Sequence, residues 1–501
     1  MRTKKVFINL LSSVFLQMVS IVVGLIIPKL IIATYGSTLN GLISSTNQII
    51  GYFGIIEGGV AAAAGASLYK PFVDNDHTRI NNIMTAVKKF YQKTGIIIGV
   101  IVTFLCIIYP LTINNQITFT KASIIMIMLS VISVLGYLVF NKYNMILVTD
   151  QKHYITLISS AIVNLLICIT QMVFMLTKMS VIFVVLVVPI LSLVRLFIIR
   201  GYIRKNYPFL NYHGEPEYQG ISQKWNALSM NISQLCKVAI PIVVLSLMYD
   251  LRVVSVYTVY SLLFHVGSSM LEISGNSITA IFGNVVAKEN HEIIKRSYDI
   301  SETLTVIVIA ILSGCFFCLT KPFIQVYVGN VSDISYSAPM LTISFIINEA
   351  ILNLRFSPKI SIKAVGKLKE ARNSGLVEII MCSILTPLCC FLFGYQGVLF
   401  GSILSGFIQT IYLTKVSYLK ILNEPIRDLY KKIIVNALFL ILGILTVKQF
   451  VQYPVNSYIE WFIYAAITGV IITLFVIIGN LIFLKKNMNP LLTQIKVLFK
   501  H

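Results

Sequence analysis

The sequence predicts an all-α, polytopic integral membrane protein of about 14 transmembrane helices, arranged as two six-helix lobes plus two C-terminal helices. Three observations predict this fold class. Of the 501 residues, 57% are hydrophobic and only 12% are charged, whereas soluble domains contain about 25% charged residues. The mean hydropathy is +0.85. Apolar stretches of roughly 20 residues, the length that spans a bilayer, recur from one end of the chain to the other.

Hydrophobicity places each expected helix between short polar segments. The first helix follows the basic start MRTKK, and its apolar run is longer than that of a signal peptide and has no small-x-small cleavage site after it. We therefore expect an uncleaved first transmembrane helix. The expected spans are 6–34, 38–68, 90–112, 119–141, 153–176, 180–201, 225–248, 253–287, 298–320, 337–357, 373–393, 396–418, 432–450 and 458–484.

The net charge of +21 would favour nucleic-acid binding in a soluble protein, but its distribution indicates membrane topology instead. The N-terminus, every second loop, the C-terminus and the helix ends beside them contain 33 of the 40 lysines and arginines. Cytoplasmic segments of membrane proteins carry such an excess of positive residues. The pattern therefore predicts two cytoplasmic termini and no nucleic-acid partner.

A conspicuously polar linker, from Arg204 to Trp225, divides the first twelve helices into two groups of six. The two halves also share features, because the first helix of each holds a Lys and a Pro and the second holds a Glu. Such placement is expected of a structural repeat whose site lies between the lobes. The expected domains are an N-terminal six-helix lobe (1–206), a cytoplasmic linker (207–222), a C-terminal six-helix lobe (223–420), and the last two helices with a basic cytoplasmic tail (421–501).

Ionisable residues deep in the expected helices are candidates for function, because a charge at mid-bilayer costs about 2.5–3.5 kcal/mol on insertion scales. Lys237 lies about 12 residues into its helix, roughly 18 Å at 1.5 Å per residue, and hence near the midplane. Pro241 has no N–H to donate to the carbonyl of Lys237, so this oxygen is free to line a polar cavity. We expect Lys237 to bind substrate.

Further acids and bases lie on helices that could border the same space. Glu57 sits among glycines and alanines that leave a thin helix, and Glu272 has similarly small and polar neighbours. The alternative is that these groups pair inside the bundle as structural ion pairs. The full set of expected substrate-binding residues is Lys29, Glu57, Lys237, Glu272, Glu349 and Arg355.

Motifs for chemistry in solution are missing from the sequence. It contains no phosphate-binding Gly-x-x-x-x-Gly-Lys-Ser/Thr loop, no His-Glu-x-x-His zinc helix and no Gly-x-Ser-x-Gly elbow. All eight cysteines fall in apolar segments, and Cys315 and Cys318 have no other metal-ligand residues nearby. We therefore expect neither an enzyme nor a metal site.

The stretch EGGVAAAAGASLYKP, from Glu57 to Pro71, resembles the second helix and first cytoplasmic loop of Wzx-type polysaccharide repeat-unit flippases. LVTDQKHYI (Leu147–Ile155) and AVGKLKEARNSGLVEII resemble later parts of the same family. These flippases belong to the multidrug/oligosaccharidyl-lipid/polysaccharide exporter superfamily. The resemblance implies twelve core helices in two lobes around a central cavity lined by helices 1, 2, 7 and 8, and two additional helices.

The resemblance also implies a function. The protein would translocate undecaprenyl-pyrophosphate-linked oligosaccharide repeat units from the inner to the outer leaflet of the bacterial plasma membrane, for capsule or exopolysaccharide biosynthesis. Its partners would be this lipid-linked oligosaccharide, membrane lipids, and a polysaccharide polymerase and chain-length regulator. Related lipid II flippases hold arginines in the cavity, whereas helices 1, 2, 7 and 8 here offer lysines. We expect no cofactor, with an ion gradient or the membrane potential as alternative driving forces.

Two other functions remain open from the sequence. A cation-coupled multidrug exporter of the same superfamily would need an aromatic-lined apolar pocket and an acid that titrates during transport. A scaffold of a polysaccharide assembly complex would transport nothing. One local expectation concerns Leu68–Pro71, the LYKP segment: because proline disfavours helical geometry in the residue before it, we expect the second helix to end there.

Overall fold

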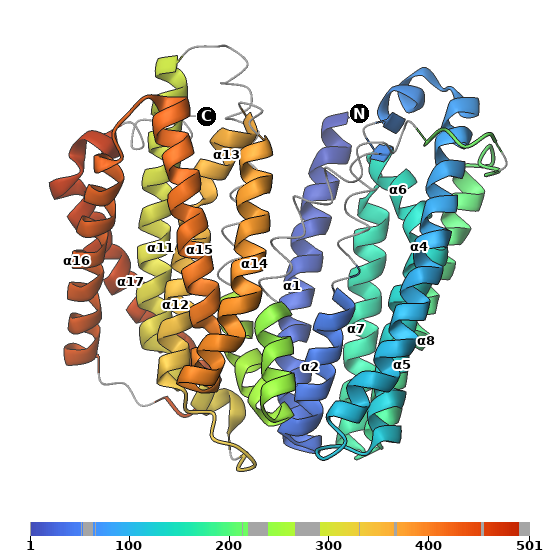
Figure 1. Cartoon of the computed structure of the whole chain (residues 1–501), viewed down its shortest axis with the longest axis horizontal. Helices are drawn as coiled ribbons and strands as arrows, with labels where there is room; N and C mark the ends of the chain where they lie inside the picture. The colour runs from blue at the N-terminus through green and yellow to red at the C-terminus, as the bar shows by residue number, and fades with distance from the viewer. Residues whose placement is uncertain are drawn as a thin grey trace. The chain divides into compact units, whose positions relative to one another are not determined.

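The structure is a computed structural model of the whole chain (Figure 1), and regular structure in the residues that it describes is helical throughout. Ten of the described helices are long and apolar enough to cross a membrane. Two shorter apolar helices, Ala239–Met248 and Leu251–His265, overlap further predicted spans, 225–248 and 253–287. The predicted polytopic, all-α membrane fold is therefore confirmed. The described residues are 2–51, 53, 64–65, 67–212, 214–218, 239–265, 291–329, 331–364, 368–451 and 455–489.

The chain forms two compact units, Met1–Ser255 and Val256–His501. The first unit includes the start of the helix Leu251–His265, because Asn40 donates a hydrogen bond to Ser255 at 2.8 Å. The lobe boundaries expected at a linker over 207–222 stay a prediction, since 219–238 lies outside the described residues.

The first unit is a bundle of long helices joined by short turns. Helix α1 packs along α7, and α4 packs along α5. A π-helical turn, Gly136–Phe140, joins α5 to α6, so the predicted span 119–141 continues as a helix to Thr149. The helices are α1 (Arg2–Tyr35), α2 (Ser37–Gly51), α4 (His77–Thr112), α5 (Phe119–Leu135), α6 (Asn141–Thr149), α7 (Tyr154–Leu176) and α8 (Val181–Asn206).

Helix α4 begins 13 residues before its predicted span of 90–112. The side chain of Asp76 accepts a hydrogen bond from the backbone N–H of Arg79 and caps the first turn. Ile80, Ile83 and Val87 recur at helical spacing and are fully buried. Hydropathy missed this part because its outer face is polar, yet its inner face belongs to the core.

The LYKP segment does not end the second predicted helix. Residues 67–74 are helical through Pro71, and the helix stops at Asn75, whose φ is +54°. The N–H of Asp76 then donates to the carbonyl of Pro71 at 3.0 Å, which is the six-to-one bond of a Schellman cap. The left-handed residue after the proline terminates this helix, and the proline itself is accommodated.

The second unit is a bundle in which α11 contacts α12, α16 and α17, and α14 lies along α15. The backbones of α14 and α15 approach closely at Gly401, where an added Cβ would lie 2.3 Å from the backbone nitrogen of Thr386. The helices are α11 (His291–Val328), α12 (Pro339–Leu354), α13 (Phe356–Ala364), α14 (Leu368–Phe393), α15 (Val398–Ser417), α16 (Arg427–Phe450) and α17 (Tyr458–Phe483).

Hydrogen bonds gather the predicted cytoplasmic segments at one end of the first unit. Asn9, near the N-terminus, donates to the carbonyl of Gln151 at 2.9 Å. Tyr207, after α8, donates its O–H to Asp150 at 2.5 Å. The N-terminal end of α1, the loop before α7 and the segment after α8 therefore share one end, which we call the basic end.

The predicted outer segments of the first unit meet in the same way. Tyr35, at the end of α1, donates its O–H to the carbonyl of Met179 at 2.5 Å. The N–H of Leu251 donates to the side chain of Gln116 at 2.7 Å. The alternation of basic and non-basic loops along the chain thus corresponds to two ends of one helical bundle.

We predict that the basic end of the first unit and the basic segments of the second unit face the cytoplasm, because positive residues are retained there. Single cysteines replacing Asp74, Lys205, Arg296 or Lys367 should resist an impermeant maleimide in intact cells. Asn115, in an expected outer loop, is exposed and supplies the control position, which should be labelled. Labelling at Asp74 with protection at Asn115 would reverse the topology.

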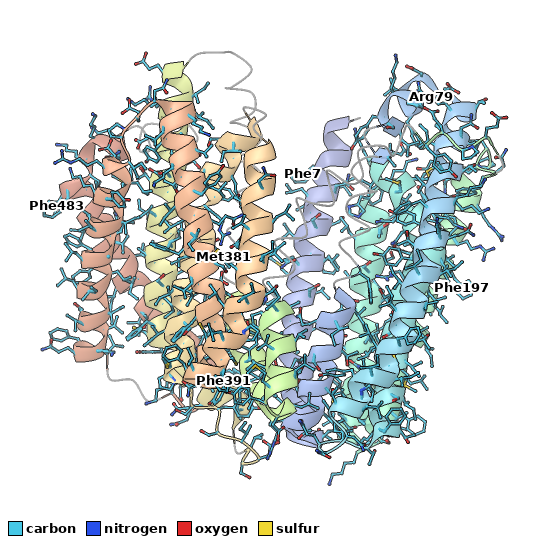
Figure 2. The ribbon with its side chains drawn as sticks, in the orientation of Figure 1. Phe7, Arg79, Phe197, Met381, Phe391 and Phe483 are labelled. Carbon is cyan, nitrogen blue, oxygen red and sulfur yellow. The ribbon has the colours of Figure 1, made fainter. Side chains whose placement is uncertain are left out.

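Large apolar side chains cover the outer surfaces of the helices. Phe197 on α8 is 64% exposed, and Phe483 on α17 is 54% exposed. Figure 2 shows both pointing away from their bundles. Such side chains are solvated by lipid tails, whereas in water a contiguous surface of this kind would drive association.

Candidate functional site

Three of the six expected substrate-binding residues belong to the described residues, namely Lys29, Glu349 and Arg355. Glu57, Lys237 and Glu272 lie outside them. The expected substrate-binding role of all six residues therefore stays a prediction.

Lys29 lies in the last third of α1, directly after Pro28, and is half-buried. It precedes Tyr35 by six residues, or about 9 Å at 1.5 Å per residue. Tyr35 holds the outer end of the helix to Met179. Lys29 is therefore placed in the outer half of the helix, toward the end that Tyr35 holds.

Glu349 lies on α12 and is half-buried. It interacts electrostatically with Tyr257, on the helix Leu251–His265, which is part of an expected cavity helix. The ring of Tyr257 lies 5.1 Å from that of Phe345, and Phe345 stacks on Phe264 at 4.9 Å. All three rings are buried, so they form a packed aromatic core beside Glu349 and leave no open aromatic pocket among themselves.

Arg355 lies at the break between α12 and α13, and its side chain is only 1% exposed. One guanidinium nitrogen donates to both carboxylate oxygens of Glu378 on α14, at 2.9 and 3.1 Å. The same nitrogen also donates to the side chain of Gln409 on α15. The structure thus gives this arginine a buried acidic partner, which is the structural alternative that the sequence left open.

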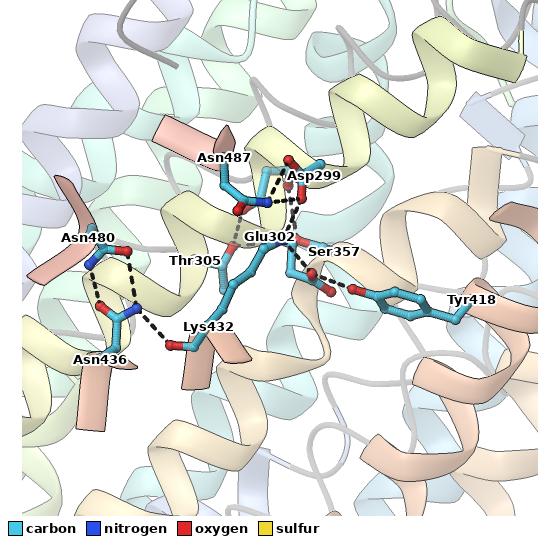
Figure 3. Close-up of polar contacts among 10 residues, drawn as sticks. Asp299, Glu302, Thr305, Ser357, Tyr418, Lys432, Asn436, Asn480 and Asn487 are labelled. Atoms are coloured by element: carbon cyan, nitrogen blue, oxygen red, sulfur yellow. Dashed lines mark hydrogen bonds and ion pairs between the residues drawn. The ribbon is translucent and has the colours of Figure 1, made fainter. Parts of the chain in front are cut away.

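Sequence analysis missed a second buried charge network in the same unit (Figure 3). Lys432 on α16 is 1% exposed, and its Nζ lies 2.5 Å from Asp299 and 2.8 Å from Glu302. Tyr418 donates its O–H to Glu302 at 2.5 Å, and Asn487 donates to Asp299 at 3.0 Å. The sequence did contain one signal for this network. Asp299 and Glu302 are three residues apart, a spacing that places both acids on one face of α11.

An amide pair joins the last two long helices (Figure 3). Asn480 on α17 donates to the side-chain oxygen of Asn436 on α16 at 2.8 Å, and Asn436 donates back at 3.3 Å. Both residues are buried. Hydrogen bonds between polar side chains hold helices together in lipid, where the hydrophobic effect does not drive helices to associate. With Lys432, the pair makes α16 and α17 an integral part of the second unit.

A hollow of about 580 Å³ lies between α4 and α5. Ile107, Ile127 and Val131 line it and are exposed on the surface of the bundle. Its walls are mainly apolar, so it fits an acyl chain better than a polar head group. Within the described residues, no group of three or more His, Cys, Asp or Glu could hold a metal ion.

Comparisons with solved structures identify similar folds. The chain has a TM-score of 0.74 and 15% identity to "Lipid II flippase MurJ, inward closed conformation", covering 95% of this chain and 99% of that one. For a single-residue mutant of the Vibrio cholerae MATE transporter VcmN, the TM-score is 0.54 and the identity 14%, covering 85% of this chain and 98% of that one.

A multidrug-resistance MATE transporter of the MOP superfamily, in its outward-facing conformation, gives a TM-score of 0.54 at 11% identity, covering 85% of this chain and 96% of that one. No protein-family model matches the sequence, and no curated protein matches it. The chain therefore has the fold of multidrug/oligosaccharidyl-lipid/polysaccharide (MOP) superfamily transporters.

Proposed function

We propose that this protein is a Wzx-type flippase that moves undecaprenyl-pyrophosphate-linked oligosaccharide repeat units to the outer leaflet of the bacterial plasma membrane. The product would feed capsule or exopolysaccharide assembly, with a polymerase and a chain-length regulator as partners. The observation that carries this proposal is the C-terminal helix pair, α16 and α17, which buried charges and amides fix into the second unit.

The extent of the structural likenesses supports the same choice. The flippase likeness covers 95% of the chain, so it leaves out about 25 residues, whereas α16 has 24 residues and α17 has 26. It therefore cannot leave out both helices. The drug-transporter likenesses cover 85%, which leaves room for both to be absent. The fold with its additional helices thus favours a lipid-linked substrate.

The proposed mechanism assigns the polar head group to the protein and the polyprenyl chain to the bilayer. Lys29 and Lys237 would attract the diphosphate, while Glu57 and Glu272 would accept hydrogen bonds from sugar hydroxyls or take up a coupling ion. Movement of one lobe against the other would expose the site to each side in turn. Two compact units suit such movement.

Purified protein in vesicles tests the proposal against its alternatives. The substrate is an undecaprenyl diphosphate bearing a short fluorescent oligosaccharide, and an impermeant reagent that destroys the fluorophore reports the exposed fraction. Faster exposure of the inner pool than in protein-free vesicles supports the flippase. Ion-driven dye movement without such exposure identifies a drug exporter, for which Glu349 beside Tyr257 supplies a candidate acid. Neither activity identifies a scaffold.

Lys237→Met should weaken substrate binding more than tenfold. A hydrogen bond to a charged group contributes about 1.5–3 kcal/mol, and about 1.4 kcal/mol is a factor of ten. The measurement is the apparent affinity for the lipid-linked sugar in the vesicle assay, alongside the yield of folded protein. Lys448→Met is the control, because Lys448 is an exposed lysine on α16.

Two outcomes would remove Lys237 from the site. A well-folded Lys237→Met protein with normal transport contradicts any role in binding. A poorly folded one that Glu272→Gln restores would show instead that the two residues form a structural ion pair.

A further inference from the structure

Three positive side chains gather at the basic end of the first unit. Lys88 lies on α4, Lys142 on α6 and Arg200 on α8. The Nζ atoms of Lys88 and Lys142 lie 5.8 and 5.4 Å from the centre of the same ring, that of Tyr212. Lys142 also experiences the charges of Lys88 and Arg200. Three helices distant in sequence thus bring like charges to one place.

No acid among the described residues forms an ion pair with any of these three cations. The neighbouring acids are engaged elsewhere, since Asp150 pairs with Lys152 at 2.7 Å and Glu217 pairs with Arg79 at 3.2 Å. Like charges held together repel, and the repulsion grows when the groups are partly buried. The three cations are all half-buried, so an anion beside them would stabilise the arrangement.

Two further donors in the cluster are ready for that anion. The Nε of Arg200 and the hydroxyl of Tyr212 are inaccessible to solvent, and neither has a hydrogen-bond partner among the described residues. Burial and the nearby Tyr143 raise the pKa of Tyr212, which keeps its hydroxyl protonated as a donor. Buried donors without partners are rare in folded proteins and indicate a ligand that completes them.

The cluster is built in advance by the segment after α8. Asn81 on α4 donates to the carbonyl of Phe209 at 2.8 Å and accepts from the N–H of Asn211 at 3.0 Å. The ring of Phe209 packs on His77 at 4.0 Å. These contacts hold Tyr212 in its left-handed conformation, with φ of +55°, between the two lysines. Side chains fixed in this way lose little entropy on binding a ligand.

The depth of the cluster identifies the class of ligand. Lys88 precedes the apolar part of α4, Lys142 follows the apolar run of α5 and the π-helical turn after it, and Arg200 ends the apolar part of α8. All three therefore lie where an apolar helix core meets the polar interface, which is the level of phospholipid phosphates. A phosphate oxygen accepts from Lys, Arg and Tyr alike.

We propose that Lys88, Lys142, Arg200 and the hydroxyl of Tyr212 bind a phosphate group, supplied by an anionic phospholipid of the leaflet at the basic end. This site shares no residue with the expected substrate-binding set, and the proposal does not depend on the flippase assignment. It would anchor the first unit to the membrane surface at a fixed depth.

Native mass spectrometry of delipidated, full-length protein tests the proposal. Phosphatidic acid should bind at least tenfold more tightly than phosphatidylcholine of the same chains. Lys142→Met and Lys88→Met should each lower the affinity for phosphatidic acid about tenfold. This is the effect expected for the loss of a hydrogen bond to a charged group. Tyr212→Phe keeps the ring but removes the hydroxyl, and it should lower the affinity for phosphatidic acid several-fold. Lys89→Met is the control, because Lys89 is the next residue on α4 and is exposed, and it should leave the affinity for phosphatidic acid unchanged.

Competition with inorganic pyrophosphate distinguishes the two possible sources of the phosphate group, a phospholipid and a soluble ligand. Poor displacement of the lipid by pyrophosphate supports a lipid site, whereas efficient displacement supports the same phosphate site with a soluble ligand. Thermal midpoints without lipid check folding, and Tyr212→Phe decides the matter if a lysine variant misfolds. Equal phosphatidic-acid affinity in Lys142→Met, Tyr212→Phe and Lys89→Met would overturn the proposal.

Discussion

Replacing Lys432 with methionine should lower the free energy of unfolding by about 3–5 kcal/mol, the range for breaking a buried ion pair from one side. The substitution would leave Glu302, whose side chain is 4% exposed, without its cation. Asp299 would lose the same partner, but its side chain is 32% exposed, so water compensates part of that loss. Thermal unfolding of the purified protein in detergent measures the effect.

Lys431→Met supplies a closely matched control, because Lys431 is the preceding residue on α16 and is exposed. It should leave the unfolding temperature unchanged. Glu302→Gln in the Lys432→Met background should recover part of the lost stability, since it removes the uncompensated charge. Equal stability of Lys432→Met and Lys431→Met would mean that this network does not hold α16 in the second unit.

The sequence predicted where the lipid-embedded parts of the helices lie, but not the full helices. Helix α11 begins at His291, seven residues before its predicted span of 298–320. Hydropathy measures contact with lipid, whereas a helix continues into the polar interface as long as one face is buried. The same reason explains the early start of α4. Apolar composition thus identifies spans well and helix ends poorly.

Charge pairing could not be predicted from the sequence for a related reason. Lys432 is the first residue of the predicted span 432–450, where a lysine is expected at the polar interface, yet its side chain is buried. Glu378 is 23 residues from Arg355 on another helix, so no local spacing connects them. Only the packing of α15 against both α12 and α14 brings the carboxylate, the guanidinium and Gln409 together.

The buried pair of Arg355 and Glu378 has a similarly large expected effect. Glu378→Gln and Arg355→Met should each lower the free energy of unfolding by about 3–5 kcal/mol, because each leaves the other charge without its partner in an apolar interior. Glu424→Gln is the matched control, since Glu424 pairs with Lys295 at the surface, where the side chains are 33% and 49% exposed. An exposed pair contributes about 0–1 kcal/mol.

The double variant Arg355→Met/Glu378→Leu separates a structural pair from a substrate-binding arginine. Replacing both charges with apolar groups of similar size should recover most of the stability, because no uncompensated charge remains inside the unit. If the pair is purely structural, the refolded double variant also transports the lipid-linked sugar at a normal rate. A stable double variant without transport, while Glu424→Gln transports normally, would show that Arg355 opens its pair to bind substrate, as the sequence had suggested.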